Sequence, residues 1–174
     1  MGLEEYLTEN KKLVNLKKLE ADYIPEEDYI NAHSKLPIVC HDAFLKYKGG
    51  ILLLRRNSPP DKGEFSAVGG RVERGIPTRQ SLIKKVYDET KLKAKNLKLI
   101  GVTRNFFDTD PFGHGKGTDT FSLVYSGNGY GEVRLNDEHS EFIRLNRNGY
   151  DSLINTLNPF IKHYAWEVLN DRQT

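Results

Sequence analysis

The chain has 174 residues, which is enough for one domain with a full hydrophobic core and too few for two of ordinary size. Hydrophobic residues make up 37% of it and charged residues 29%, as in an ordinary soluble globular protein. No apolar run approaches the roughly 20 residues that span a bilayer, so we do not expect a membrane protein. The net charge is only +2, with basic and acidic residues interspersed, and nucleic acid is therefore not an implied partner.

Two features bear on the compartment. The N-terminal stretch "MGLEEYLTENKK" is acidic and polar, whereas a secretory signal begins basic and continues apolar. Cys40 is the only cysteine, and its setting in "LPIVCHDAF" favours a strand position over an activated nucleophile. We expect a cytoplasmic location and no redox chemistry.

Residues 1–35 are predicted to form an N-terminal helical arm. The segment "IPEED" predicts a helix that starts at Pro25 with acids in its first turn. For the charged stretch "KKLVNLKKLE" we favour a solvated helix face, and the alternative is a helix that docks on a second subunit. The apolar residues at helical spacing in the first part of the arm are Tyr6, Leu13, Leu16 and Leu19.

Residues 36–146 alternate between strand and helix signals. The stretch "LPIVCHDAFLKYKGGILLLRR" predicts a hairpin that turns at 48–50, because Gly-Gly supplies positive φ values. "EFSAVGG" predicts a short strand, Thr78 an N-cap of a helix to about Lys91, and "NLKLIGVTRNFF" another strand. "DTDPFGHGKGTD" and "GNGYGE" are typical of a loop and a turn on either side of the strand "TFSLVYS". Residues 147–174 predict two helices that are separated at Pro159.

A glycine-rich turn leads into the predicted helix in "GGRVERGIPTRQSLIKKVYDETKL", residues 69–92. This stretch resembles a Nudix box, G-x5-E-x7-R-E-U-x-E-E-x-G-U, where U is a bulky aliphatic residue. With Gly70 as the first glycine, the remaining slots hold Ile76 for Glu, Lys84 and Lys85 for Arg-Glu, Asp88 and Glu89 for the paired acids, and Lys91 for the second Gly.

The two acids have a structural and a functional interpretation. They could balance Lys84 and Lys85 at i,i+4 on the helix surface. We favour the second interpretation, in which Asp88 and Glu89 project beside the turn at 69–70, because they follow Gly-Gly-Arg in the register of the box. Carboxylate oxygens grouped in this way suit Mg²⁺ or Mn²⁺.

The resemblance implies the α/β fold of the family, a Nudix α/β/α sandwich with a mixed sheet between helices, plus the N-terminal helical arm. It implies a single Nudix domain over 1–174, with the arm at 1–35, the Nudix core at 36–146 and C-terminal helices at 147–174. The depleted box is similar to that of the GDP-mannose mannosyl hydrolases, and the likeness runs from Pro25 to Leu145. Outside the box, three further stretches resemble this branch: "EEDYINAHSKLPIVCHDAF", "LLLRRNSPPDKGEFSAVGGR" and "NDEHSEFIRL".

The branch implies a hydrolase of nucleoside diphosphate sugars of the GDP-mannose kind, in which water attacks the anomeric carbon and nucleoside diphosphate leaves. It also implies a homodimer that forms through the N-terminal helix. The implied roles are Mg²⁺ or Mn²⁺ ligands at the Gly69 carbonyl, Glu89 and Glu138 with Asp88 beside them, diphosphate contacts at Arg56 and Arg71, a general base at His139, and substrate contacts at Asp42 and Phe121.

Two other functions stay open. The first is a regular Nudix pyrophosphohydrolase that cleaves a nucleoside diphosphate derivative at phosphorus. The second is a non-catalytic nucleotide-binding module in which Lys85 pairs with Glu89. We interpret His114 and Lys116 as ordinary residues of a loop that could close over substrate, and the sequence assigns no role to the other histidines: His33, His41 and His163.

Overall fold

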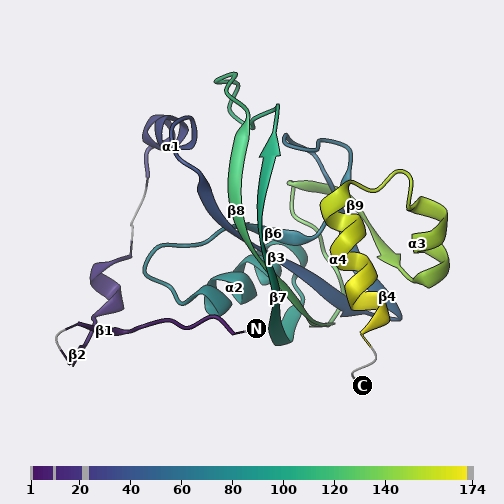
Figure 1. The fold of residues 1–174 in the computed structure, drawn as a ribbon, viewed down its shortest axis with the longest axis horizontal. Coiled ribbons are helices and arrows are strands. Elements are labelled where there is room, and N and C mark those ends of the chain that lie inside the picture. The colour runs from purple at the N-terminus through teal and green to yellow at the C-terminus, as the bar shows by residue number, and fades with distance from the viewer. Residues whose placement is uncertain (1, 10, 21–23, 172–174) are drawn as a thin grey trace.

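The computed structural model describes residues 2–9, 11–20 and 24–171 (Figure 1). Its helices are α1 (Glu26–His33), α2 (Thr78–Thr90), α3 (Arg147–Leu153) and α4 (Pro159–Asn170), with a 3-10 helix η1 (Leu16–Lys18). Its strands are β1 (Thr8–Glu9), β2 (Lys12–Leu13), β3 (Ile38–Tyr47), β4 (Gly50–Arg56), β5 (Phe65–Ser66), β6 (Val68–Arg71), β7 (Lys93–Phe107), β8 (Thr118–Tyr130) and β9 (His139–Leu145).

In the described part of the chain, β3 to β9 form a seven-stranded mixed sheet in the order β5-β4-β3-β8-β7. β3 runs parallel to β8 on one side. On its other side the first half of β3 pairs with β6 and the second half with β4, both antiparallel. β9 pairs with β4. Both edges of β3 are therefore occupied, and β3 lies at the centre of the fold.

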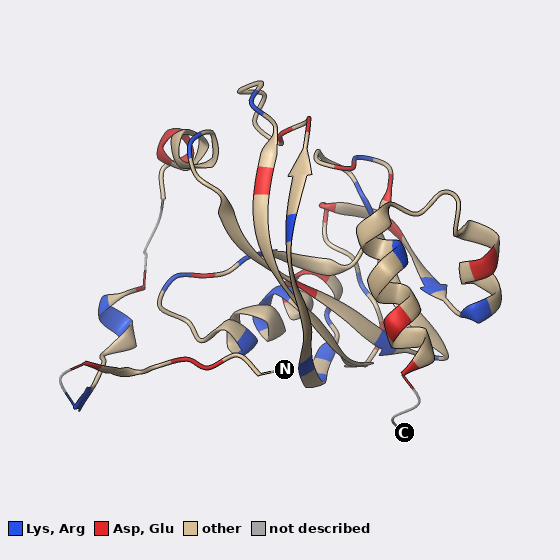
Figure 2. Cartoon of the chain, in the orientation of Figure 1, with Lys and Arg blue, Asp and Glu red and all other residues tan. Residues whose placement is uncertain are grey.

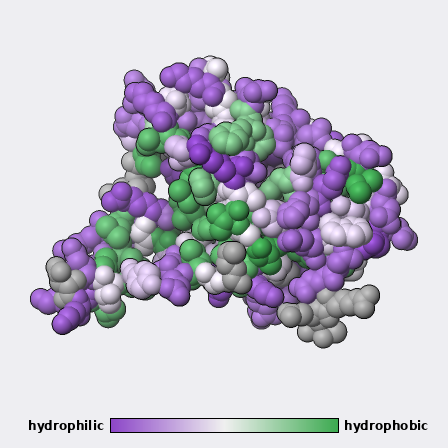
Figure 3. All heavy atoms as spheres, viewed as in Figure 1, coloured by the Kyte–Doolittle hydropathy of each residue, from purple (hydrophilic) through white to green (hydrophobic). Residues whose placement is uncertain are grey.

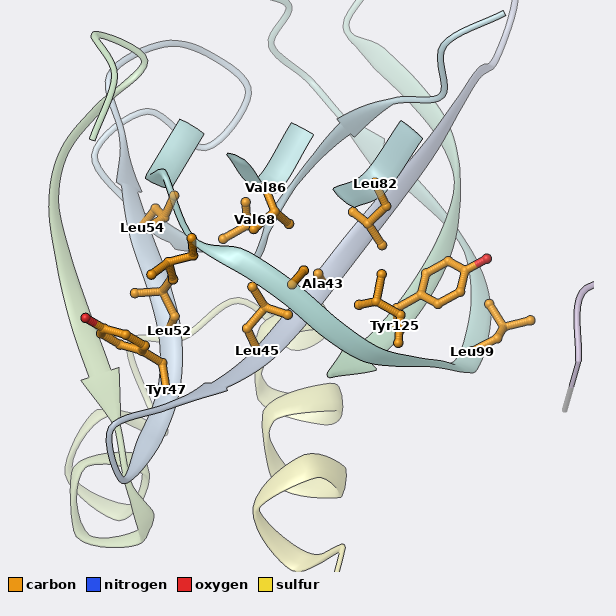
Figure 4. Packing of buried hydrophobic residues seen from close by; sticks show 13 residues of the cluster. Ala43, Leu45, Tyr47, Leu52, Leu54, Val68, Leu82, Val86, Leu99 and Tyr125 are labelled. Carbon is orange, nitrogen blue, oxygen red and sulfur yellow. The ribbon is translucent and has the colours of Figure 1, made fainter. Parts of the chain in front are cut away.

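Helices cover both faces of this sheet. Leu82 and Val86 of α2 pack with Leu45, Tyr125 and other side chains on one face (Figure 4). Residues of α4, among them Ile161, pack on the opposite face, against Phe44 and its neighbours. Consecutive residues of β3 point to opposite sides because the side-chain period of a strand is two. The predicted α/β/α sandwich is confirmed.

Local signals place several elements correctly. The hairpin turns within residues 48–50, as predicted. The positive φ values fall on Lys48 and Gly49, at 43° and 86°, rather than on the two glycines, because Gly50 is already the first residue of β4. Helix α2 begins one residue earlier than predicted, since Pro77 occupies the N-cap position and Thr78 is the first helical residue. The Thr78 backbone N–H and hydroxyl both donate to Glu5 Oε1, at 2.8 and 2.7 Å. Glu5 thus supplies the cap that Thr78 was predicted to supply.

The helix predicted for the first part of the arm is wrong, although α1 is confirmed. The described residues there form the β1–β2 pair and η1, and the β1–β2 pair lies away from the sheet (Figure 1). Tyr6 and Leu13 are 81% and 84% exposed. Periodic apolar residues stabilise a helix mainly by packing, and these two have no packing surface.

The turn predicted for "GNGYGE" begins later than expected, because β8 continues to Tyr130 and the chain bends only at Gly131, where φ is 113°. The two earlier glycines allow close packing rather than a turn. A Cβ on Gly127 would lie 2.8 Å from Leu97, and a Cβ on Gly129 would lie 3.0 Å from Leu92. A strand glycine can mark such a close approach.

Charged residues of both signs are interspersed along the ribbon (Figure 2). Figure 3 shows hydrophobic surface near the middle of one face. The exposed residues Val39 and Phe121 lie in adjacent register positions of β3 and β8.

Among the helices that the structure describes, none combines the length and the apolar character needed to cross a membrane.

Candidate active site

Glu89 is the centre of a compact polar group. It lies on α2 and is only 1% exposed. Lys85, one turn earlier, places Nζ 2.9 Å from Glu89 Oε1 and 3.6 Å from Glu138 Oε2. His139 Nε2 lies 3.2 Å from Glu89 Oε2. The ligand atoms of Glu89, Glu138 and His139 lie within 4.8 Å of one another, and we call these three residues the acidic group.

Backbone hydrogen bonds hold the turn that carries Glu138 and His139 against α2. The Asn136 N–H donates to the Glu89 carbonyl at 3.2 Å. The Asn57 N–H donates to the Glu138 carbonyl at 3.0 Å, which connects the same turn to the end of β4. Residues 50 positions apart in sequence are therefore fixed together by main-chain contacts.

Two glycines bring β6 close to Lys85 of α2 and to β3. A Cβ on Gly70 would lie 2.8 Å from Lys85 Cε. A Cβ on Gly69 would lie 2.5 Å from Asp42 Oδ1 and closer still to the His41 carbonyl. At Gly69 the neighbouring backbone leaves no room for a side chain, whereas at Gly70 only the flexible end of Lys85 would have to move.

A cavity of about 550 Å³ opens beside this strand, between β3, β6 and the start of α4. The Arg71 guanidinium carbon lies 4.5 Å from the centroid of the Tyr29 ring. Arg56 Nε donates to the Pro60 carbonyl at 2.6 Å. Arg56 of β4 is also the register partner of His139 of β9, and this strand pairing connects the cavity wall to the acidic group. The polar and aromatic residues of its wall include Tyr29, His33, Asp42, Arg56 and Arg71.

Burial shifts the protonation of two groups on this wall. It raises the pKa of the Asp42 carboxyl to about 6, against the hydrogen bond with Ser122 and the charge of Arg56. Burial also raises the pKa of the Cys40 thiol to about 12, and the charge of Asp42 adds to that effect. Cys40 is therefore a thiol at neutral pH, as expected for a cysteine that is not an activated nucleophile.

The structure places the predicted site residues in two sets, the cavity wall and the acidic group, and leaves two of them outside both. Asp88 is exposed on α2 and lies outside the acidic group. Phe121 is 45% exposed and, among the described residues, is not part of the cavity wall. Its neighbours Thr120 and Ser122 do line the cavity, and successive strand residues point to opposite faces. Sequence reasoning also missed His33, whose i,i+4 spacing from Tyr29 on α1 was the available signal.

The donor set fits one divalent cation. Two carboxylates suit Mg²⁺ or Mn²⁺, and an imidazole suits Mn²⁺ better. Burial alone would lower the pKa of Lys85, but Glu89 and Glu138 raise it above its ordinary value, so Lys85 stays positively charged at neutral pH. Its ammonium lies within reach of both carboxylates and repels further cations. The set therefore favours one ion rather than several.

Comparisons with known proteins bear on the family of the chain rather than on its individual site residues. A family model described as NUDIX domain matches residues 41–163, more than half of the chain. An ADP-ribose pyrophosphatase of Methanocaldococcus jannaschii is 33% identical over 113 residues, which are 63% of this chain and 63% of that protein. The low-salt glycan biosynthesis protein Agl8 of Haloferax volcanii is 26% identical over 118 residues, which are 68% of this chain and 72% of that protein.

The fold is shared with a crystal structure of a MutT NUDIX hydrolase from Burkholderia pseudomallei, at a TM-score of 0.61 and 22% identity. That likeness covers 76% of this chain and 98% of the other. The narrower resemblance to GDP-mannose mannosyl hydrolases gains no specific support from these relatives. The family prediction, by contrast, is confirmed, and the chain belongs to the Nudix family.

Proposed function

We propose that this chain hydrolyses nucleoside diphosphate derivatives with the help of one divalent metal ion, and that its substrates are nucleoside diphosphate sugars. One observation carries the proposal. Arg56 and Arg71 lie on the wall of a cavity of about 550 Å³, and Arg56 pairs in register with His139 of the acidic group. Guanidinium groups can bind a diphosphate through two oxygens at once, and the cavity is in the size range of small-molecule sites.

In this proposal Glu89, Glu138 and the Gly69 carbonyl would hold Mg²⁺ or Mn²⁺. The ion would supply positive charge against the oxygens of the diphosphate. Arg56 and Arg71 orient that diphosphate and stabilise the charge that grows on it. Asp88 is exposed and takes no part.

His139 is the proposed general base, and its hydrogen bond supports the assignment. A carboxylate can only accept, so neutral His139 donates from Nε2 to Glu89 Oε2 over 3.2 Å. Nδ1 is then the nitrogen with a free lone pair. It is buried and has no hydrogen-bond partner among the described residues. This atom has the lone pair that would take a proton from an attacking water, which must first gain access to it because it is buried.

Attack at the anomeric carbon is the first candidate. Lys85 stands in a Nudix-box slot that usually holds glutamate, and its charge limits the number of ions. Departure of an intact nucleoside diphosphate needs stabilisation of the leaving group, which one ion and two arginines can provide. Attack at phosphorus is the second candidate, favoured by the 33% identity to a protein named ADP-ribose pyrophosphatase.

Product analysis in ¹⁸O water tests these candidates. The protein is incubated with Mg²⁺ or Mn²⁺ and GDP-mannose, ADP-ribose or UDP-glucose. Label on free sugar, with nucleoside diphosphate formed, supports attack at carbon. Label on a phosphate, with nucleoside monophosphate formed, supports attack at phosphorus. Metal-independent binding without turnover, measured by calorimetry, would instead favour the binding module, for which the Lys85–Glu89 pair at 2.9 Å is the relevant observation.

The proposal includes a cytoplasmic homodimer that forms through α1. Tyr29 is engaged by Arg71 and Phe112, so Ile30 and Ala32 are the α1 residues considered for the contact. Light scattering over a range of concentrations tests it. A monomer mass at every concentration would contradict the proposed dimer and would leave the proposed hydrolytic site unaffected.

A further inference from the structure

His33 is a buried histidine that faces the cavity. It is the last residue of α1, it is 8% exposed, and it belongs to the cavity wall. Its Nδ1 lies 2.8 Å from Nε2 of His114, which belongs to the loop between β7 and β8. Nδ1 is therefore occupied. Nε2 is the ring nitrogen that remains for a ligand.

Hydrogen bonds in the loop determine which nitrogen of His33 carries the proton. The Lys116 backbone N–H donates to His114 Nδ1 at 3.1 Å, whereas Asp110 Oδ2 lies farther from the same nitrogen, at 3.5 Å. The shorter contact requires a lone pair on Nδ1, so in neutral His114 the hydrogen is on Nε2. His114 Nε2–H then donates to His33 Nδ1. Neutral His33 must consequently carry its own hydrogen on Nε2, as a donor.

Asp110 holds this loop in place. Its side chain accepts backbone N–H bonds from Phe112 at 2.9 Å, His114 at 3.1 Å and Gly115 at 2.9 Å. The Phe112 ring packs edge-on against His33 and Tyr29, with centroids 5.1 and 5.3 Å away. The loop and α1 are thus fixed to each other at the cavity wall.

The neighbours of His33 indicate what its free nitrogen meets. Tyr29 lies between His33 and Arg71, with ring centroids of Tyr29 and His33 6.3 Å apart. Ile38 and Phe107 add apolar surface to the same cavity. A flat apolar group with acceptors along its edge fits such a wall, next to a cation for its phosphates. A nucleobase has this chemistry.

We propose that His33 is a specificity-determining residue that donates Nε2–H to an acceptor atom of the nucleobase of a bound nucleoside diphosphate. The proposal rests on the proposed function, and it assigns a contact that the sequence did not indicate. Burial and the neighbouring His114 lower the pKa of His33, against the opposing effect of Asp110. The ring is therefore neutral at neutral pH, as a single-proton donor must be.

The tautomer can be measured without substrate. Two-dimensional ¹⁵N NMR of the ligand-free protein at neutral pH should show His33 protonated on Nε2 and unprotonated on Nδ1. In His114→Phe the donor to Nδ1 is lost, and His33 should then populate both tautomers. A proton on Nδ1 of His33 in the unaltered protein would overturn the relay.

Calorimetry with Mg²⁺ tests the ligand contact. In His33→Phe, binding of ADP, GDP or UDP should weaken by about 3- to 10-fold, the effect of one neutral hydrogen bond, while binding of pyrophosphate stays unchanged. His33→Gln keeps a side-chain N–H donor and should recover much of the loss. His163→Phe, which changes an exposed histidine of α4, is the matched control and should bind all ligands normally.

The outcomes separate this inference from the proposed function. Equal weakening for nucleoside diphosphates and pyrophosphate would show a structural effect and overturn the nucleobase contact. Unchanged binding in His33→Phe, in a protein that hydrolyses nucleoside diphosphate sugars, would overturn the role of His33 alone. Failure of the unaltered protein to bind or hydrolyse any of these compounds would overturn both proposals.

Discussion

Replacing Asp42 by Asn should stabilise the protein above neutral pH and have little effect in acid. Burial raises the pKa of Asp42 from the ordinary 3.8 to about 6. Between these two values the folded protein binds a proton that the unfolded chain has released, so the free energy of unfolding falls as pH rises. This difference of about two pKa units corresponds to about 3 kcal/mol of the free energy of unfolding. The protein has fully lost this contribution above pH 7. Asn has the same shape and no charge to bury.

Urea unfolding of both proteins at several values between pH 4 and pH 8 measures this effect. The difference in free energy of unfolding should grow from well under 1 kcal/mol near pH 4 to about 3 kcal/mol above pH 7. Asp151→Asn, at an exposed acid of α3, is the control and should show no such trend. A constant difference between Asp42→Asn and the unaltered protein would refute the reasoning, because the carboxyl would then titrate alike in both states.

Four further changes test the site and the arm. Lys85→Glu removes the cation beside the acidic group, so calorimetry with Mn²⁺ should count at least one additional ion; an unchanged stoichiometry contradicts the role of Lys85. His139→Gln should cut turnover by roughly 10² to 10⁴, and a loss below tenfold would exclude it as the base. Gly69→Ala should destabilise by at least about 1 to 3 kcal/mol through overpacking, measured in urea. Glu5→Ala should cost about 1 kcal/mol as a lost helix cap, whereas Glu9→Ala should be neutral; equal effects would argue against capping.

Local sequence signals predicted the elements well where each element packs as its pattern requires. The place of the β3–β4 hairpin follows from the glycines at its turn, although Lys48 and not Gly50 shares the positive φ values with Gly49. Helix α2 follows from helical spacing with a buried face. Residues 6–19 show the limit. The same periodicity is present there, but nothing in the pattern indicates whether another surface will cover it.

Some residues of the site could likewise be predicted from local sequence, and others could not. Lys85 and Glu89 could be paired from their i,i+4 spacing alone. Asp88 adjoins Glu89 in sequence, but each helical residue is turned by about 100° from the last, and Asp88 therefore faces solvent. His139 was named through the family resemblance. No local pattern could have paired His33 with His114, 81 residues away.

Because β3 is paired along both edges, different parts of the site should open to solvent at different free energies. β3 carries Asp42 and is hydrogen-bonded along both edges, to β8 on one side and to β6 and β4 on the other. Its amide protons should exchange with solvent only when the whole domain opens. Glu138 instead sits in an exposed turn before β9, where small local openings suffice. Hydrogen exchange would thus find the amides of β3 protected and those of the turn that carries Glu138 faster to exchange, so this one member of the acidic group could move without loss of the fold.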